Sequence, residues 1–242
     1  MASIMSVNPC SCSCVILSHD PAVVTSLGYL LRVVLQCDCK VVTETDDAFV
    51  DLEPYFAPAP DVFFAYADPH NQSALSQVSA VRDKGMPTLV IAVLKDLPDL
   101  GAQMYEAGAA DVVHWPADLK EIALRLRHHL GHKWDPSRTI DLSADWEAES
   151  YVADLADLTT AEAQIVRILM AKDGRIVTRD ELSLALDARP WRHGDRKFDV
   201  HMAKIRKKLL AAFGSNLTVA TIRSRGYRLS TNGSNLFSSV DD

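Results

Sequence analysis

Short apolar runs alternate with amphipathic helical spacing along the first half of the chain. The apolar runs predict buried strands at residues 14–19, 39–44, 61–67, 88–94 and 111–115. After each run, apolar positions recur at helical spacing, at residues 23–35, 46–56, 71–85, 96–108 and 117–130. This strict alternation predicts an α/β flavodoxin-like domain, in which helices cover both faces of a doubly wound, five-stranded parallel sheet. Its site is expected at the carboxyl ends of the strands.

The pattern changes after residue 131. Residues 131–157 combine turn residues with polar and apolar alternation, which predicts short antiparallel strands. The segments "TTAE" at 159–162 and "TRDE" at 178–181 both fit the capping box, so a helix is expected to begin at each. A third helix follows from residue 196, and the residues from 217 to 230 predict a hairpin that turns at "SRG".

Length and composition fit two soluble domains. The chain has 242 residues, 48% of them hydrophobic and 24% charged, and no apolar run is long enough for a membrane helix. The amino terminus lacks the basic and apolar regions of a secretory signal, so a cytoplasmic protein with reduced thiols and no membrane partner is expected. The predicted organisation is an N-terminal tail, a first domain, a linker, a second domain and a C-terminal tail, at residues 1–13, 14–131, 132–138, 139–230 and 231–242.

The charge is distributed unevenly between the two halves. Residues 1–132 carry 8 Lys and Arg against 16 Asp and Glu, a net of 8 − 16 = −8. Residues 159–230 carry 15 against 7, a net of 15 − 7 = +8. This asymmetry indicates that only the second half meets a polyanion, most plausibly nucleic acid.

The third helix combines an apolar stripe with a basic face. Phe198, Met202, Ile205 and Leu209 recur at helical spacing and predict the face that packs on a core. Cations surround that stripe and recur on the hairpin, a combination that suits insertion into the DNA major groove. The candidate DNA-binding residues are Arg196, Lys197, His201, Lys204, Arg206, Lys207, Lys208, Arg223 and Arg225.

The motifs of residues 139–230 resemble the winged-helix effector domain of OmpR/PhoB-type response regulators. The segments that carry the resemblance are "LTTAEAQIVRILMAKDGRIVTRDEL", "RKFDVHMAKIRKKL" and "VATIRSRGYRL". The resemblance implies a recognition helix at 195–211, a wing at 223–226, and a loop at 187–195 that contacts RNA polymerase through Arg189, Trp191 and Arg192. It also implies a bacterial, non-enzymatic regulator of transcription that needs no cofactor and joins the nucleoid when bound to DNA. Two wing positions depart from the family pattern, because Ser224 replaces a usual Gly and Arg225 a usual apolar residue.

The first domain resembles a CheY-like receiver in layout but not in its chemical residues. A receiver needs acidic ligands for Mg²⁺, an Asp that accepts the phosphoryl group, a hydroxyl and a Lys. Matched by position, those roles fall on Ser18, His19, Tyr66, Ala92 and Trp115. The sequence therefore predicts a pseudo-receiver that acts without phosphorylation, with Tyr66, Ala92 and Trp115 forming an apolar plug. Asp20 and Asp68 lie nearby, and Asp68 is interpreted as a turn or capping residue.

The resemblance also implies a homodimer formed through the fourth helix, fifth strand and fifth helix of the receiver. Asp111 and Arg125 match one ion pair of that face, whereas Gln103 stands where a cation is usual. Apolar contacts are expected to dominate, from Tyr105, Val113 and Leu126, because exposed ion pairs contribute little. Such a dimer would read two half-sites, as a direct or an inverted repeat.

The cysteines keep an alternative open. Cys10, Cys12, Cys14, Cys37 and Cys39 are the only cysteines. Cys14, Cys37 and Cys39 are expected at one edge of the sheet, so all five thiols could cluster there. They could bind a metal or sense redox state in place of phosphate, or serve only as small buried residues. Two further alternatives are an enzyme that binds a nucleotide or flavin, disfavoured by the missing Gly-rich turn, and a module that titrates other regulators.

Overall fold

The computed structural model describes residues 12–43, 56–71, 73–131 and 143–231. The chain divides into two compact units, one with described residues 12–131 and the other with 143–231. Each unit has its own buried hydrophobic core. Among the described residues, no helix has the length and apolar character needed to cross a membrane.

The first unit is the predicted five-stranded parallel sheet. Its strands are β1 (Ser13–Leu17), β2 (Asp38–Val42), β3 (Val62–Ala67), β4 (Leu89–Lys95) and β5 (Asp111–Trp115). They lie in the order β2-β1-β3-β4-β5, and every neighbouring pair is parallel. This is the doubly wound topology that the alternating pattern predicted, so the expected fold class is confirmed.

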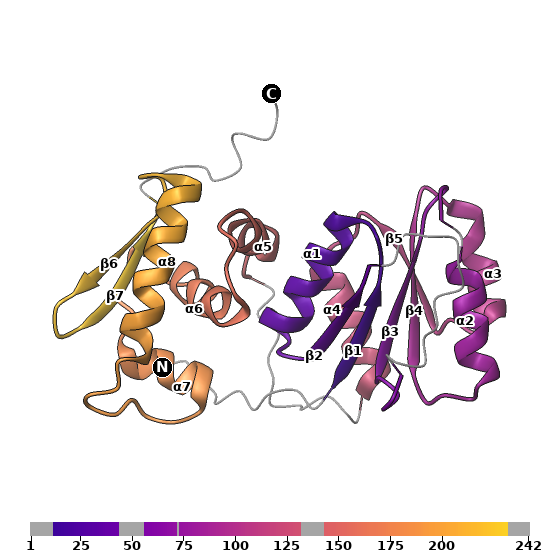
Figure 1. The fold of residues 1–242 in the computed structure, drawn as a ribbon, viewed down its shortest axis with the longest axis horizontal. Coiled ribbons are helices and arrows are strands. Elements are labelled where there is room, and N and C mark those ends of the chain that lie inside the picture. The colour runs from indigo at the N-terminus through magenta and orange to yellow at the C-terminus, as the bar shows by residue number, and fades with distance from the viewer. Residues whose placement is uncertain (1–11, 44–55, 72, 132–142, 232–242) are drawn as a thin grey trace. The chain divides into compact units, whose positions relative to one another are not determined.

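Helices cover both faces of this sheet (Figure 1). One face carries α1 (Pro21–Tyr29), its π-helical extension η1 (Leu30–Val34) and α4 (Leu119–Leu130). The other carries α2 (Ala74–Asp83) and α3 (Gly101–Ala107), the latter preceded by the short 3-10 helix η3 (Pro98–Leu100). The helix expected at 46–56 lies outside the described residues except for Phe56, which is buried.

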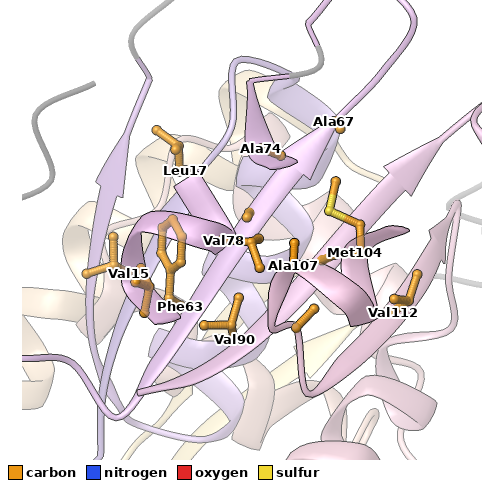
Figure 2. Packing of buried hydrophobic residues seen from close by; sticks show 14 of the residues in the cluster. Val15, Leu17, Phe63, Ala67, Ala74, Val78, Val90, Met104, Ala107 and Val112 are labelled. Carbon is orange, nitrogen blue, oxygen red and sulfur yellow. The ribbon is translucent and has the colours of Figure 1, made fainter. Parts of the chain in front are cut away.

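The core beneath α2 and α3 fixes which side chains point to each face. Phe63 and Val90, on adjacent strands, pack with Val78 of α2 and Met104 of α3, and all are buried (Figure 2). Burying one such side chain contributes about 1.5–3 kcal/mol. Because strand side chains alternate, the residues between these must face α1 and α4.

The second unit begins with a helix where strands were expected. Residues Trp146–Leu155 form α5, so the prediction of short antiparallel strands is wrong for this segment. Asp145 caps the helix, its Oδ1 accepting the amide of Ala148 at 3.0 Å, and Trp146 and Val152 are fully buried. The apolar positions therefore follow a helical period, which the short pattern did not distinguish from strand alternation.

The other elements of the second unit follow the predicted order. Helices α6 (Thr160–Met170) and α7 (Arg179–Asp187) both start at complete capping boxes, as the sequence predicted. They are followed by α8 (Lys197–Phe213), β6 (Thr218–Ile222) and β7 (Gly226–Ser230), and the two strands pair as an antiparallel hairpin.

The hairpin packs closely against the segment that leads into α7. A bridge joins Val177 to Tyr227, with backbone hydrogen bonds of 2.8 and 2.9 Å. A Cβ at position 226 would lie 2.1 Å from the carbonyl oxygen of Val177, and Gly226 has φ of +141°. Only glycine fits this contact, which fixes where the hairpin leaves the body of the unit.

Candidate functional site

Helix α8 separates a buried stripe from an exposed face, as its sequence predicted. Phe198, Met202, Ile205 and Leu209 are each at most 1% exposed and belong to the core of the second unit. The exposed positions near the start and middle of the helix are Arg196, Lys197, Asp199, Val200, Ala203, Lys204 and Lys207, of which Asp199 pairs with Arg179. We call these positions the outward strip of α8. The predicted cations His201, Arg206 and Lys208 are only partly exposed and lie outside it.

Three predicted DNA-binding cations bond to the protein itself. Lys208 donates to Glu162 Oε2 at 2.8 Å and to the carbonyl of Asp157, so it ties α8 to the start of α6. Arg206 donates to the carbonyl of Val219 at 2.8 Å and to Thr221 Oγ1, so it ties α8 to β6. Lys197 pairs with Asp187 at 2.6 Å.

The remaining predicted cations differ in exposure. Lys204, Lys207, Arg223 and Arg225 are exposed, and their side chains make no hydrogen bond or ion pair with another residue in the described part of the chain. Arg223 and Arg225 flank Ser224, which has φ of +58°, at the hairpin tip. His201 is half-buried, and its Nδ1 lacks a partner among the described residues.

The loop before α8 is held by its own contacts. The Trp191 backbone amide donates to Asp180 Oδ1 at 2.9 Å, and its indole Nε1 donates to the Asp195 carbonyl at 3.2 Å. Arg189 lies 3.5 Å from Asp195 Oδ2. Arg192 is exposed. The loop is thus a fixed surface segment that presents Arg192.

A polar cluster occupies the carboxyl ends of β1, β3 and β4 in the first unit. The hydroxyl of Tyr66 lies 3.2 Å from both Asp20 Oδ2 and Asp68 Oδ2. The ammonium of Lys95 is 2.7 Å from Asp20 Oδ2, and His19 Nε2 is 3.0 Å from Asp68 Oδ2. We call Asp20, Tyr66, Asp68, Lys95 and His19 the carboxylate pocket.

The Oδ1 atom of each carboxylate in this pocket caps a local turn. Asp20 Oδ1 accepts the amides of Ala22 and Val23 at the start of α1, at 2.8 and 3.4 Å. Asp68 Oδ1 accepts the amides of His70 and Asn71, at 2.8 and 2.9 Å. The interpretation of Asp68 as a turn-capping residue is therefore confirmed.

The strand register corrects the predicted plug. Ala92 is fully buried among the residues under α2 and α3, so its side chain lies on the other face of the sheet from Tyr66. The register partner of Tyr66 on β4 is Val93, so the side chain of Lys95, two positions later, lies on the same face as Tyr66. Sequence matching therefore misplaced Ala92 and missed Lys95. A register taken from the end of β4 would have indicated it.

Two other predicted residues lie at the border of the pocket. Ser18 is buried, and its Oγ accepts the amide of Asp20 at 3.1 Å, so it supports the turn that carries Asp20. Trp115 is half-buried at the end of β5 and pairs in register with Lys95. Because register partners point to one side of a sheet, Trp115 emerges beside the pocket.

The electrostatics of the pocket favour ionised carboxylates and a neutral phenol. Burial raises the pKa of Asp20, but the hydrogen bonds from Lys95 and from two backbone amides lower it by a larger amount. The net pKa of Asp20 therefore lies below its usual value. The pKa of Asp68 is also lowered, because two amides, His19 and Tyr66 outweigh burial. Burial and the two carboxylates raise the pKa of Tyr66 above its usual value.

The pocket does not fit the Mg²⁺ ion that a phosphorylated receiver requires. A hard cation of this kind needs free carboxylate oxygens and room for its waters. All four carboxylate oxygens of Asp20 and Asp68 already accept from an ammonium, a phenol, an imidazole or backbone amides. The Lys95 ammonium supplies the positive charge next to Asp20.

Parts of this chain are similar to known proteins. Residues 154–229 match the family described as "Transcriptional regulatory protein, C terminal". The Haemophilus influenzae CpxR homologue is 30% identical over 137 residues, which span 52% of this chain and 60% of that protein. The Salmonella choleraesuis virulence regulator PhoP is 26% identical over 83% of this chain and 92% of its own length. The second unit is therefore similar to the C-terminal domain of known transcriptional regulatory proteins.

Among solved structures, the chain is similar to one response regulator. It is HP1043, an orphan response regulator of Helicobacter pylori, with 17% sequence identity and a TM-score of 0.42. The match covers 51% of this chain and 99% of that one.

The face of α3, β5 and α4 contains the residues that were predicted to form a dimer contact. Asp111 accepts from Arg125 at 2.8 Å, and His129 Nε2 lies 3.1 Å away, while the Tyr105 hydroxyl is 3.4 Å from the same carboxylate. Tyr105 is 51% exposed, and Gln103 is also exposed.

The structure corrects two of the apolar contacts expected on this face. Val113 and Leu126 are buried inside their own unit, at 6% and 1% exposure. They cannot form the contact surface. Tyr105 is the large exposed apolar side chain that remains there.

The Lys95–Asp20 pair predicts a pH dependence. Because the folded-state pKa of Asp20 lies below its ordinary value of 3.8, its stabilising contribution is present above that value and lost as pH falls through the folded-state pKa. Replacing Lys95 with Met should lower the free energy of unfolding at neutral pH. Acidification to about pH 3 should then lower the free energy of unfolding of Lys95→Met by less than it lowers that of the wild type.

Urea unfolding of both proteins across this pH range measures the effect. Lys40→Met is the matched control, because Lys40 is exposed on β2 and has no ion pair with a described residue. Parallel stability curves for wild type and Lys95→Met would show that the pair does not stabilise the fold.

Proposed function

We propose that the protein is a DNA-binding transcription regulator whose receiver acts without phosphorylation. The observation that carries DNA binding is the set of exposed cations, Lys204, Lys207, Arg223 and Arg225, that the described protein leaves without partners. The first two project from the outward strip of α8 and the other two from the hairpin tip. A helix in the major groove and a wing on the neighbouring backbone would use both groups.

Val200 adds an apolar position to the same strip. It is 56% exposed one turn before Lys204, in a unit whose other large apolar side chains are mostly buried. An exposed methyl-bearing side chain among cations suits contact with base edges, because the thymine methyl is the apolar feature of the major groove. The three self-bonded cations, Lys197, Arg206 and Lys208, are assigned to positioning α8.

Phosphorylation independence rests on the carboxylate pocket. Tyr66 stands at the end of β3 where the family has its acceptor Asp, and its hydroxyl joins the two nearby carboxylates. Lys95 neutralises Asp20 without a metal ion. These contacts hold the carboxyl ends of the strands in one arrangement. They leave no site at which a phosphoryl group could act as the signal.

The proposed active form is a homodimer through α3, β5 and α4. Tyr105 offers an exposed aromatic side chain beside the Asp111–Arg125 pair, and Gln103 lies in the same helix. A dimer would place two recognition helices on half-sites about 34–36 Å apart, as a direct or an inverted repeat. Arg189, Trp191 and Arg192 are assigned to contact with RNA polymerase, for which Arg192 is exposed.

A second candidate input replaces phosphate with cysteine chemistry. Cys12, Cys14 and Cys37 have sulfur atoms within 4.8 Å of one another. Gating by redox state, a metal or a small ligand would use this group.

The DNA-binding role predicts the same effect for one cation of α8 and one cation of the hairpin tip. After selection of a binding site from random duplexes, Lys204→Ala should weaken binding and reduce the slope of log affinity against log salt by about 0.9, since one phosphate contact is lost. Arg225→Ala should do the same. Fluorescence anisotropy at several salt concentrations measures both, with Lys40→Ala as the control that changes neither. Unchanged affinity in both variants would mean that another face binds DNA.

The dimer predicts a concentration-dependent mass. Tyr105→Ala should raise the dissociation constant by about tenfold, because it removes the exposed aromatic contact. Sedimentation equilibrium measures it, and Ser76→Ala, an exposed change on α2, is the control. A wild-type protein that stays monomeric at concentrations where it binds DNA would refute this dimer.

A further inference from the structure

Four cysteines gather where β1 and β2 begin, at the opposite end of the sheet from the carboxylate pocket. Cys14 pairs in register with Cys39, and the amide of Asp38 donates to the carbonyl of Cys12 at 3.1 Å. Alternation then places Cys12 and Cys14 on one side of the sheet, with Cys37 and Cys39 beside them. All four are buried and none is in a disulfide, whereas Cys10 lies outside the described residues.

Three of these thiols converge and the fourth does not. The sulfurs of Cys12, Cys14 and Cys37 all lie within 4.8 Å of one another, and those of Cys12 and Cys14 are 3.9 Å apart. The sulfur of Cys39 lies outside this group and is 3.8 Å from the carbonyl oxygen of Lys40. Cysteines used only as small buried residues need not direct their sulfurs to one point.

The spacing suits a metal bound by thiolates. A metal–sulfur distance of about 2.3 Å places the sulfurs of a three-coordinate site about 4 Å apart. The converging sulfurs would need shifts of less than about 1 Å to reach this geometry. The three thiols are buried, at 3%, 2% and 8% exposure, which suits Cu⁺ bound by three thiolates alone, whereas Zn²⁺ would need a fourth ligand.

We propose that Cys12, Cys14 and Cys37 bind one thiophilic d¹⁰ metal ion, Zn²⁺ or Cu⁺, through three thiolates. Soft thiolate ligands select these ions among common cellular metals. Binding forms three metal–sulfur bonds and releases the three thiol protons to solvent. The site shares no residue with the proposed DNA-binding surface, because its residues lie in the first unit and none belongs to α8 or the hairpin.

Metal binding at this site is expected to depend on pH, because each thiol must lose its proton to become a ligand. A metal ion must then compete with protons for the sulfurs, and its affinity should fall as pH falls.

The test uses the reduced full-length chain under anaerobic conditions. Zn²⁺ is titrated against a chromophoric chelator, and Cu⁺ against a Cu⁺-specific one. We expect one ion per chain, and a loss of affinity of roughly a hundredfold in Cys14→Ser and in Cys37→Ser. Cys39→Ser is the matched control and should stay within about threefold of wild type, since its sulfur is outside the group.

Two further measurements separate a lost site from a lost fold. Thermal melting of each apo variant checks folding. Cys37→Ser is the milder substitution, because Cys37 precedes β2 whereas Cys14 lies within β1. X-ray absorption of the metal-loaded wild type should show sulfur neighbours at about 2.3 Å. DNA affinity, measured separately, shows whether a failure belongs to this site or to the proposed function.

Binding of either ion with this variant pattern supports the site, and the relative affinities identify the ion. Wild-type protein that binds neither Zn²⁺ nor Cu⁺ would overturn the proposal. Binding that survives both Cys14→Ser and Cys37→Ser in folded protein would also overturn it. A loss in Cys39→Ser equal to that in Cys14→Ser would refute the three-ligand assignment.

Discussion

The ammonium of Lys95 lies 2.7 Å from Asp20 at the point where the central strands of the receiver end. Asp20 in turn caps the first helix, and its second oxygen reaches the phenol of Tyr66, which also contacts Asp68. This chain of contacts links the starts of α1 and of the segment after β3 to the end of β4. The Lys95 side chain supplies the positive charge next to Asp20, and the hydroxyl of Tyr66 connects the two carboxylates.

The parallel register makes this arrangement possible. Tyr66 lies opposite Val93, so the next outward position on β4 is Lys95, which emerges on the Tyr66 side of the sheet. The hydrophobic frame is that of an ordinary doubly wound domain, and the change is confined to side chains at one sheet end. The second unit shows the same division. Its core holds the stripe of α8 in place, and Arg206 and Lys208 fix the helix to β6 and α6.

The fold could be predicted from the sequence wherever one pattern dominated over several residues. The five apolar runs and the two capping boxes gave the sheet and the helix starts, because strand burial and amide capping are local properties. The segment at 146–155 was assigned to strands because a short apolar pattern fits either period. Within the site, Tyr66 and Asp68 were predicted because they end a strand, whereas Lys95 required the register between two strands. Val113 and Leu126 were taken as surface residues because sequence position does not reveal which face of a strand or helix is covered. Lys204 and Lys208 differ in role because Lys208 bonds to Glu162, 46 residues away in the sequence. No local pattern contains that contact.

One measurement tests directly whether the closed pocket has replaced phosphorylation. Purified full-length protein is incubated with Mg²⁺ and a small-molecule phosphodonor, and intact-mass spectrometry and DNA affinity are recorded on the same sample. If Lys95, Tyr66 and the two carboxylates form a self-sufficient pocket, neither the mass nor the DNA affinity changes. A phosphorylated carboxylate at Asp20 or Asp68, accompanied by tighter DNA binding, would contradict it.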